Sequence, residues 1–208
     1  MRNNRTTPSS SSAAGKSVLA ASPRIHEQAH EIQPYNALIR LPVGLSEEVR
    51  HNSVENLNQL LADTITLRDL YKKHHWQVSG PTFYSLHLLF DKHAQELSEA
   101  TDEIAERILQ LGGIAVAMGA DVSEATLIPR PPKGREDAPC QIARLLHAHE
   151  IVVEEARTFA RQAEEHRDVA TNDLLITDVI RLHEMQIWFL AEHLTPTPLL
   201  HEEHDGMA

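Results

Sequence analysis

Four long segments with helical hydrophobic periodicity limit what this chain can fold into. Apolar residues recur at intervals of three and four over residues 46–78, 84–111, 139–165 and 171–193. Ser79-Gly80-Pro81 follows the first segment and Gly112-Gly113 follows the second, and both sequences are typical helix terminators. The pattern therefore predicts an all-α fold built on four helices.

The start of the first helix is also marked. Ser46 is placed to cap it, and Glu47 and Glu48 fall in its first turn, where negative charge is favourable. The connection between the second and third helices, residues 114–137, is rich in proline and glycine. We expect a crossover there, with one short helical piece near 122–125.

The two ends of the chain differ in composition from the predicted bundle. Residues 1–35 are rich in serine, alanine, threonine and proline and have no hydrophobic period, which predicts a disordered tail. No acidic residue precedes Glu27, so an organelle transit peptide is the alternative. The expected organisation is a tail over 1–35, one four-helix domain over 36–195 and a flexible tail over 196–208.

The charge balance argues against a basic surface for nucleic acid. The chain has 30 Asp and Glu residues against 19 Lys and Arg, a composition that suits metals with oxygen ligands better. Cys140 is the only cysteine, which excludes an intrachain disulfide and favours a reducing compartment. No segment reaches the roughly 20 apolar residues of a membrane helix. These features predict a cytoplasmic protein with no membrane association.

The second predicted helix carries two pairs of candidate metal ligands. His87 and Asp91 are four residues apart, and so are Asp102 and Glu106, with about three turns between the pairs. All four side chains therefore share one helix face. The pairs are about 16 Å apart along the axis, whereas a ligand lies about 2 Å from its metal. One helix cannot bring both pairs to one ion.

Two copies of this helix that cross antiparallel about a two-fold axis remove the difficulty, because each pair then approaches the other pair of the second copy. The turn after the first helix returns His75 to the neighbourhood of His87, which makes His75 a fifth candidate ligand. Such ligands suit iron(II), and zinc, manganese or cobalt are alternatives. On spacing alone, a solvated acidic face is the more common explanation for such residues.

A longer signature favours the metal interpretation. It comprises the run from His75 to Phe83 (HWQVSGPTF), then His87 with Asp91, then Asp102-Glu-Ile-Ala-Glu-Arg107 and Leu111-Gly-Gly113. With this signature the chain resembles, over residues 46–194, the Dps family, named after the DNA-binding protein from starved cells. The resemblance implies a ferritin-like four-helix bundle that assembles into a hollow homododecamer.

The resemblance also implies an activity and its ligands. It implies a ferroxidase that oxidises iron(II), preferably with hydrogen peroxide rather than dioxygen, and stores ferric iron in the cage, which protects against oxidative stress. By position, His75, His87 and Asp91 of one subunit and Asp102 and Glu106 of its two-fold mate would be the catalytic ligands of two iron ions per site.

Other residues have roles that the resemblance suggests. Members of the family line a three-fold pore with acidic residues, which makes Asp168, Asp173 and Asp178 candidates for the iron entry path. Trp76, beside the ligand His75, is assigned to interface packing, with quenching of oxidising equivalents as the alternative.

Several histidines lie outside the predicted ligand set. His74 and His93 neighbour the proposed site, where they could bind a further metal such as zinc. His147 and His149 are about 200° apart around their helix, so this pair is not expected to share a metal.

The main alternative function is an architectural DNA-binding protein that protects the nucleoid. Residues 1–35 contain four basic and two acidic residues ahead of an acidic body. Twelve such tails would bind DNA through avidity, with strong salt dependence. A cage that buffers metal without oxidising it is the other alternative.

Overall fold

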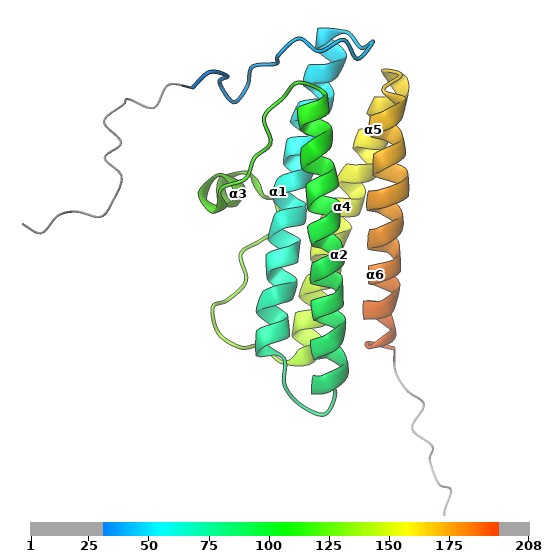
Figure 1. Cartoon of the computed structure of the whole chain (residues 1–208). Coiled ribbons are helices and arrows are strands. Elements are labelled where there is room, and N and C mark those ends of the chain that lie inside the picture. Colours follow the sequence, from blue (N-terminus) through cyan, green and yellow to red (C-terminus); the bar gives the residue numbers. More distant parts are fainter. Residues whose placement is uncertain (1–30, 196–208) are drawn as a thin grey trace, which may run out of the picture. The chain divides into compact units, whose positions relative to one another are not determined.

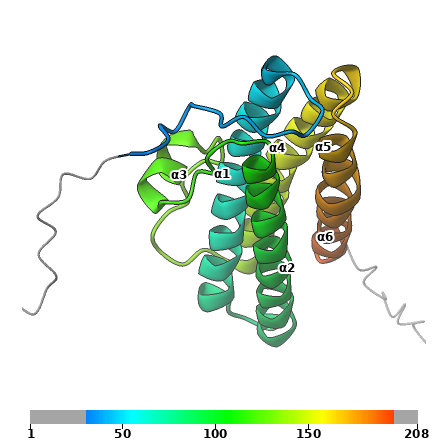
Figure 2. The same cartoon turned by 45° about the horizontal axis from the view of Figure 1, so that its top comes forward.

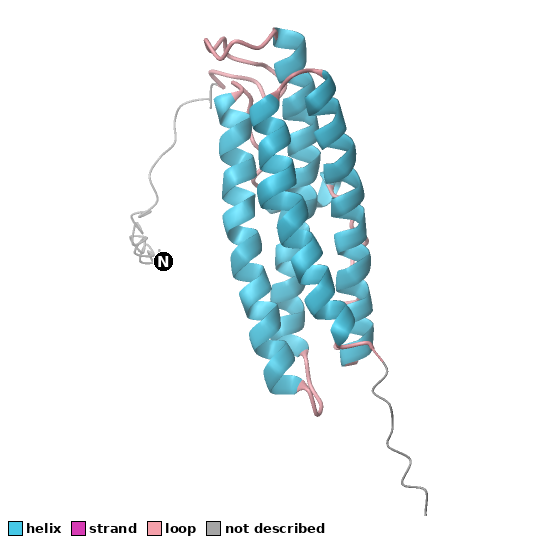
Figure 3. Cartoon of the chain, turned by 90° about the vertical axis from the view of Figure 1, so that its right-hand side faces the viewer, coloured by secondary structure: helices cyan, strands magenta, loops and turns pink. Residues whose placement is uncertain are grey.

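The structure, a computed structural model, describes residues 31–195, which form a bundle of long helices that run side by side (Figures 1 and 3). The elements in chain order are α1 (Glu47–Gln77), α2 (Phe83–Gln110), α3 (Gly119–Ala125), α4 (Ala138–Glu165), α5 (Val169–Leu174), the π-helical segment η1 (Leu175–Ile180) and α6 (Arg181–Glu192). The predicted all-α fold is confirmed. The tails predicted over 1–35 and 196–208 lie outside the described residues, except for 31–35. None of the helices within 31–195 is both long and apolar enough to span a membrane.

The capping residues place the helix ends close to their predicted positions. The Ser46 hydroxyl accepts the N–H of Val49 at 3.3 Å and caps α1, as the sequence predicts. α1 ends before Val78, and Gly80, with φ of +103°, helps to turn the chain into α2. The antiparallel pair α1 and α2 that results brings the end of α1 beside the start of α2.

The crossover that follows α2 is fastened to α1 along its length. α3 lies outside the bundle and packs on α1 (Figure 2). Beyond α3, the buried Asp63 carboxylate of α1 accepts the Thr126 hydroxyl at 2.6 Å and the Leu127 N–H at 2.7 Å. One carboxylate thus holds the loop where it leaves α3.

The last helical run differs from its prediction. The sequence predicted one helix over 171–193, whereas the run begins at Val169 and contains the π-helical segment η1 between α5 and α6. A π turn adds a residue to the helical repeat and rotates everything that follows. Because a short π turn leaves the hydrophobic pattern nearly unchanged, periodicity does not reveal it.

A strap before α1 is fixed to the end of α2. The Ile39 N–H and the Gln33 side-chain amide both donate to the carbonyl of Gly112 at 2.9 Å. Arg50, on α1, donates to the carbonyls of Ile39 and Leu111, each at 2.9 Å. Gly112 has φ of +88°, and a Cβ there would lie 2.4 Å from the Ile39 carbonyl oxygen. Only glycine fits this position.

Gly112→Ala is expected to destabilise the protein by about 2 kcal/mol or more, because alanine disfavours positive φ and its methyl group would displace the strap. Thermal unfolding followed by circular dichroism measures the effect. Gly134→Ala is the control, since nothing lies within 4 Å of its added Cβ and its φ is not positive. Equal melting temperatures for the two variants would contradict this account of the strap.

Candidate metal centre

His75 and His87 face each other across the turn between α1 and α2. Their ring centroids are 3.8 Å apart and the ring planes are inclined by 19°. Each Nδ1 lies 2.8 Å from the main-chain carbonyl oxygen of the other histidine. Because a carbonyl oxygen can only accept, each Nδ1 carries a proton. In the neutral rings Nε2 therefore holds the lone pair, which is the form of histidine that binds a metal.

Asp91, one turn after His87 on α2, completes this half of the candidate site. Its Oδ1 lies 4.0 Å from Nε2 of His75 and accepts a hydrogen bond from Lys72 Nζ at 2.6 Å. The bond from Lys72 lowers the pKa of Asp91, so the carboxylate is ionised. The ammonium group of Lys72 thus lies where a metal cation would neutralise Asp91. A metal ion must therefore compete with Lys72 for this carboxylate.

Asp102 and Glu106 lie at the other end of α2. Both are exposed, and the uninterrupted helix keeps Asp102 about 16 Å and Glu106 about 22 Å from Asp91 along its axis. The structure therefore places His75, His87 and Asp91 near one another but leaves the other two predicted ligands apart. Within residues 31–195 no three His, Cys, Asp or Glu side chains of one subunit converge to hold a metal.

The end of α2 that carries Asp102 and Glu106 is strongly acidic. Partial burial raises the pKa of Glu103, and the negative charges of four neighbouring acids raise it further. Those acids are Asp178, Glu99, Asp102 and Glu106. A groove of about 530 Å³ runs beside Asp102 between α1 and α2. Uncompensated negative charge of this kind attracts cations.

The three predicted pore residues have different environments. Asp168 is 1% exposed and caps α5, where its carboxylate accepts hydrogen bonds from Ser53, Arg107 and Thr171. Its negative charge is therefore paired and hydrogen-bonded within the subunit. Asp173 and Asp178 are exposed, so a prediction of an acidic entry path depends mainly on these two residues.

Trp76 projects from the end of α1 with 70% of its surface exposed. The nearest cation, Lys72 Nζ, lies 6.0 Å from its ring centroid. Such an exposed indole in a single subunit is available to an interface, which is consistent with the packing role predicted for it.

A chain of buried polar side chains that the sequence did not reveal crosses the bundle. Nδ1 of His93 lies 3.1 Å from the hydroxyl of Tyr71, which lies 2.6 Å from Nε2 of His149. Nδ1 of His149 lies 2.9 Å from Nδ1 of His183. The four residues come from α2, α1, α4 and α6 in turn, and each is fully buried. We call them the histidine–tyrosine chain.

Burial keeps these histidines neutral. It lowers the pKa of His93 to about 4, that of His183 to about 3 and that of His149 well below 6.5. His74, the other histidine considered for a further metal, is also fully buried and has its pKa lowered to about 4. His147 is instead exposed on the opposite side of α4 from His149.

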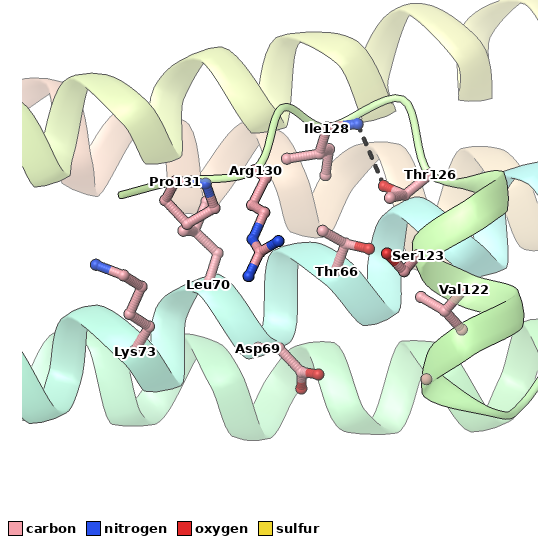
Figure 4. A pocket seen from close by; sticks show the side chains of 11 residues that line it. Thr66, Asp69, Leu70, Lys73, Val122, Ser123, Thr126, Ile128, Arg130 and Pro131 are labelled. Atoms are coloured by element: carbon pink, nitrogen blue, oxygen red, sulfur yellow. Dashed lines mark hydrogen bonds between the residues drawn. The ribbon is translucent and has the colours of Figure 1, made fainter. Parts of the chain in front are cut away.

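A cavity of about 660 Å³ lies elsewhere, between α1, α3 and the crossover (Figure 4). Its charged lining residues are Asp69, Lys73 and Arg130, and the others are neutral. It contains no histidine and a single carboxylate, so its lining does not suit iron. The turn between α1 and α2 remains the better candidate for a metal centre.

Comparison with known proteins identifies the family. The family model of the ferritin-like domain matches residues 54–200, which is more than half of the chain, so the chain belongs to the ferritin-like family. DpsC from Streptomyces coelicolor has 48% sequence identity and a TM-score of 0.81, over 83% of this chain and all of DpsC. The chain is a member of the Dps family of mini-ferritins.

Two further relatives extend this similarity. A Dps protein from Vibrio cholerae O1, described as a ferritin-like di-iron-carboxylate protein, has 27% identity and a TM-score of 0.71 over 76% of this chain and 99% of its own. The nutrient stress-induced DNA-binding protein of Nostoc sp. is 30% identical over 168 residues, which cover 81% of this chain and 91% of the relative.

The free energy of unfolding is expected to fall as the pH drops below about 6.5. His149 and His183 are neutral in the folded protein but bind protons once unfolded, because their folded pKa values lie below the ordinary one. Each contributes a loss of about 1.4 kcal/mol per pH unit below 6.5. Urea unfolding between pH 5 and 6.5 measures the slope.

His183→Gln is expected to reduce this slope by about 1.4 kcal/mol per pH unit, the contribution of one proton, because glutamine does not titrate. His147→Gln is the matched control, because His147 is exposed on the same bundle. A slope that is equally steep in wild type and His183→Gln would show that His183 is protonated in the folded state.

Proposed function

We propose that the protein oxidises iron(II) at two equivalent sites formed between two-fold-related subunits and stores the ferric product inside a cage. The observation that carries this proposal is the division of ligands on α2. One end has Asp91 near two histidines whose Nε2 atoms hold the lone pair, and the other has the exposed acids Asp102 and Glu106. Antiparallel pairing of two α2 helices would bring the Asp91 end of each helix to the Asp102 end of the other.

The ligands in the two halves of the site suit iron, a substrate whose positive charge increases when iron(II) is oxidised to iron(III). His75 and His87 supply neutral nitrogen atoms, whereas Asp91 and the partner's Asp102 and Glu106 would supply three negative carboxylates. Carboxylates stabilise iron(III) more than iron(II), so they favour the loss of an electron. The acidic end of one subunit would also draw Lys72 of the other away from Asp91.

Hydrogen peroxide is the proposed oxidant. When two iron(II) ions each give one electron, the O–O bond breaks and two protons complete two water molecules. A single iron ion can give only one electron, and the reaction then releases hydroxyl radical. The role of the protein is therefore to position two ions at one site before peroxide reacts.

The cage is proposed to be a homododecamer, as the resemblance implies. Exposed apolar side chains at several helix ends support assembly, since a monomer rarely leaves so many uncovered. They include Trp76, Tyr84, Met118, Val169 and Trp188. Asp173 and Asp178 are the proposed acidic residues of the iron entry path, and both face solvent in the subunit.

Protection of DNA is the second candidate function. The Nostoc relative is described as a DNA-binding protein, and the basic residues of the N-terminal segment precede an acidic body. Electrophoretic mobility shift is expected for the full chain at low salt and to be lost when residues 1–30 are removed. Undiminished binding by the truncated protein would assign any DNA contact to the bundle.

Asp102→Ala with Glu106→Ala is expected to leave the assembly intact and to slow iron(II) oxidation by about 100-fold or more, because each site loses the ligands from one subunit. Stopped-flow absorbance after mixing with iron(II) and hydrogen peroxide measures the rate, and light scattering checks assembly. Glu99→Ala with Glu103→Ala is the control, since it removes the same charge from the same helix. Equal rates for both variants would contradict the ligand assignment.

Mixed cages test whether the site is shared. A second variant, His75→Ala with His87→Ala, lacks the other half of the site. Each variant alone should be inactive, but in a random equal mixture about one quarter of sites combine an intact half from each subunit. Recovery of about one quarter of the wild-type rate is expected. No recovery in co-assembled cages would mean that all five ligands act within one subunit.

A further inference from the structure

The histidine–tyrosine chain takes no part in the reaction proposed above. Its four side chains are fully buried in the bundle interior, where leucine would fill the same space without polar atoms. Burying polar groups is costly unless they are hydrogen-bonded to one another. Nε2 of His93 and Nε2 of His183, at the two ends, have no partner within the described residues. Such an arrangement calls for a function that packing does not supply.

The distances favour one direction for the hydrogen bonds. The contact of the Tyr71 hydroxyl with His149 is 2.6 Å and that with His93 is 3.1 Å. A hydroxyl donor makes the shorter contact, so Tyr71 donates to Nε2 of His149 and accepts from Nδ1–H of His93. His149 then carries its own proton on Nδ1 and donates it to Nδ1 of His183. Each link has one donor and one acceptor.

Tyr71 lies close to the candidate iron site. It is four residues before His75 on α1, which is about 6 Å of helical rise. Its ring centroid is 6.0 Å from that of Phe90, the residue before Asp91. The phenol is therefore about one helical turn from the metal ligands, while its hydroxyl is shielded from solvent by the bundle.

We propose that Tyr71 is a one-electron donor that removes strong oxidants formed at the iron site, with His149 as the acceptor of its proton. This role rests on the proposed function, because iron and peroxide chemistry supplies the oxidant. The oxidant is hydroxyl radical, which forms when a site holds only one iron(II) ion and peroxide receives a single electron.

The electrons and protons of this step balance. Hydroxyl radical takes one electron from Tyr71 and one proton from solvent and becomes water. The Tyr71 O–H bond breaks, its proton bonds to Nε2 of His149, and a neutral tyrosyl radical remains. His149 passes its Nδ1 proton to His183, so the positive charge moves away from the radical. A later iron(II) ion returns one electron while the protons move back, which restores the phenol.

The surroundings of the chain suit this transfer. Burial raises the pKa of Tyr71 well above 10 and lowers that of His149, so the resting pair is a neutral phenol and a neutral imidazole. The proton moves only when the phenol loses an electron, because oxidation makes the phenolic proton strongly acidic. The Glu96 carboxylate raises the pKa of both Tyr71 and His93, whereas the nearby Lys92 ammonium lowers that of His93. Glu96 accepts a hydrogen bond from Gln186 at 3.0 Å. By raising the pKa of Tyr71, its negative charge keeps the resting phenol protonated.

The other oxidisable aromatic residues lack these features. Tyr84 is 71% exposed and Trp76 is 70% exposed, so a radical on either would meet solvent and other molecules. Within the described residues neither side chain donates a hydrogen bond to a histidine. Tyr71 is the tyrosine whose proton has a defined destination, which is what makes its oxidation reversible.

The test is rapid-freeze electron paramagnetic resonance of the full-length assembled protein, loaded with one iron(II) per site and mixed with hydrogen peroxide. A tyrosyl radical signal is expected in wild type and should narrow when the protein contains ring-deuterated tyrosine. Tyr71→Phe should abolish the signal and increase oxidation of Trp76, as measured by mass spectrometry. Tyr84→Phe, the matched control, should retain the signal.

His149→Gln provides an independent variant if Tyr71→Phe fails to assemble. It keeps the phenol but replaces the imidazole base, and it should also lose the signal. A tyrosyl signal that persists in Tyr71→Phe, or that disappears in Tyr84→Phe, overturns the proposal. So does a wild-type signal that responds only to deuterated tryptophan.

Stopped-flow iron oxidation on the same samples separates this proposal from the proposed function. Rapid iron oxidation with no tyrosyl signal overturns the role of Tyr71 alone. If wild type fails to oxidise iron, the proposed function fails, and an iron-free photochemical oxidant, a ruthenium tris-bipyridyl complex with persulfate, then tests Tyr71. A photogenerated tyrosyl signal lost in Tyr71→Phe supports the donor role, and one unchanged in that variant overturns it.

Discussion

The buried Asp168 carboxylate joins three helices, and the position of α2 depends on it. It accepts the Ser53 hydroxyl of α1 at 2.7 Å, the Arg107 guanidinium of α2 at 2.8 Å and the Thr171 hydroxyl of α5 at 2.7 Å. A buried carboxylate is tolerated only when it is paired in this way. Because adjacent residues point about 100° apart on a helix, the inward direction of Arg107 turns the preceding Glu106 toward solvent.

The length of α2 between its two proposed ligand pairs would then link metal binding to assembly. A rigid helix holds Asp91 and Asp102 about 16 Å apart, so the halves cannot close on one ion inside a subunit. The separation also leaves an acidic end, where partial burial and then repulsion from the neighbouring carboxylates raise the pKa of Glu103. A second subunit that brings its histidines, its Lys72 and a metal cation to this end would reduce the repulsion among these carboxylates. Iron and the second subunit should therefore favour each other's binding.

The sequence predicted what a single helix can encode. Ser46 and Gly112-Gly113 marked helix ends, because helix capping is a local signal. The four-residue spacings are equally local, and the two ligand pairs that they indicate on α2 stay a prediction. The contact between Tyr71, His149 and His183 was missed because it depends on the rotation of three helices about their axes. For His183 that rotation follows the π turn in η1, which the hydrophobic pattern does not register. The role of Asp168 as a cap was missed because the helix was predicted to begin at 171 and not at Val169, and its contacts with Ser53 and Arg107 depend on how the helices pack.

The burial gradient along α1 separates two kinds of chemistry that need opposite surroundings. Tyr71 is fully buried, the His75 side chain is 14% exposed, and Trp76 is 70% exposed. A metal that enters and leaves requires ligands that solvent can reach and a charged environment. A phenol that gives up an electron and recovers its proton requires a dry site with its acceptor already in place. Because the proposed iron ligands lie at the surface of the bundle, its interior is free to hold such a site.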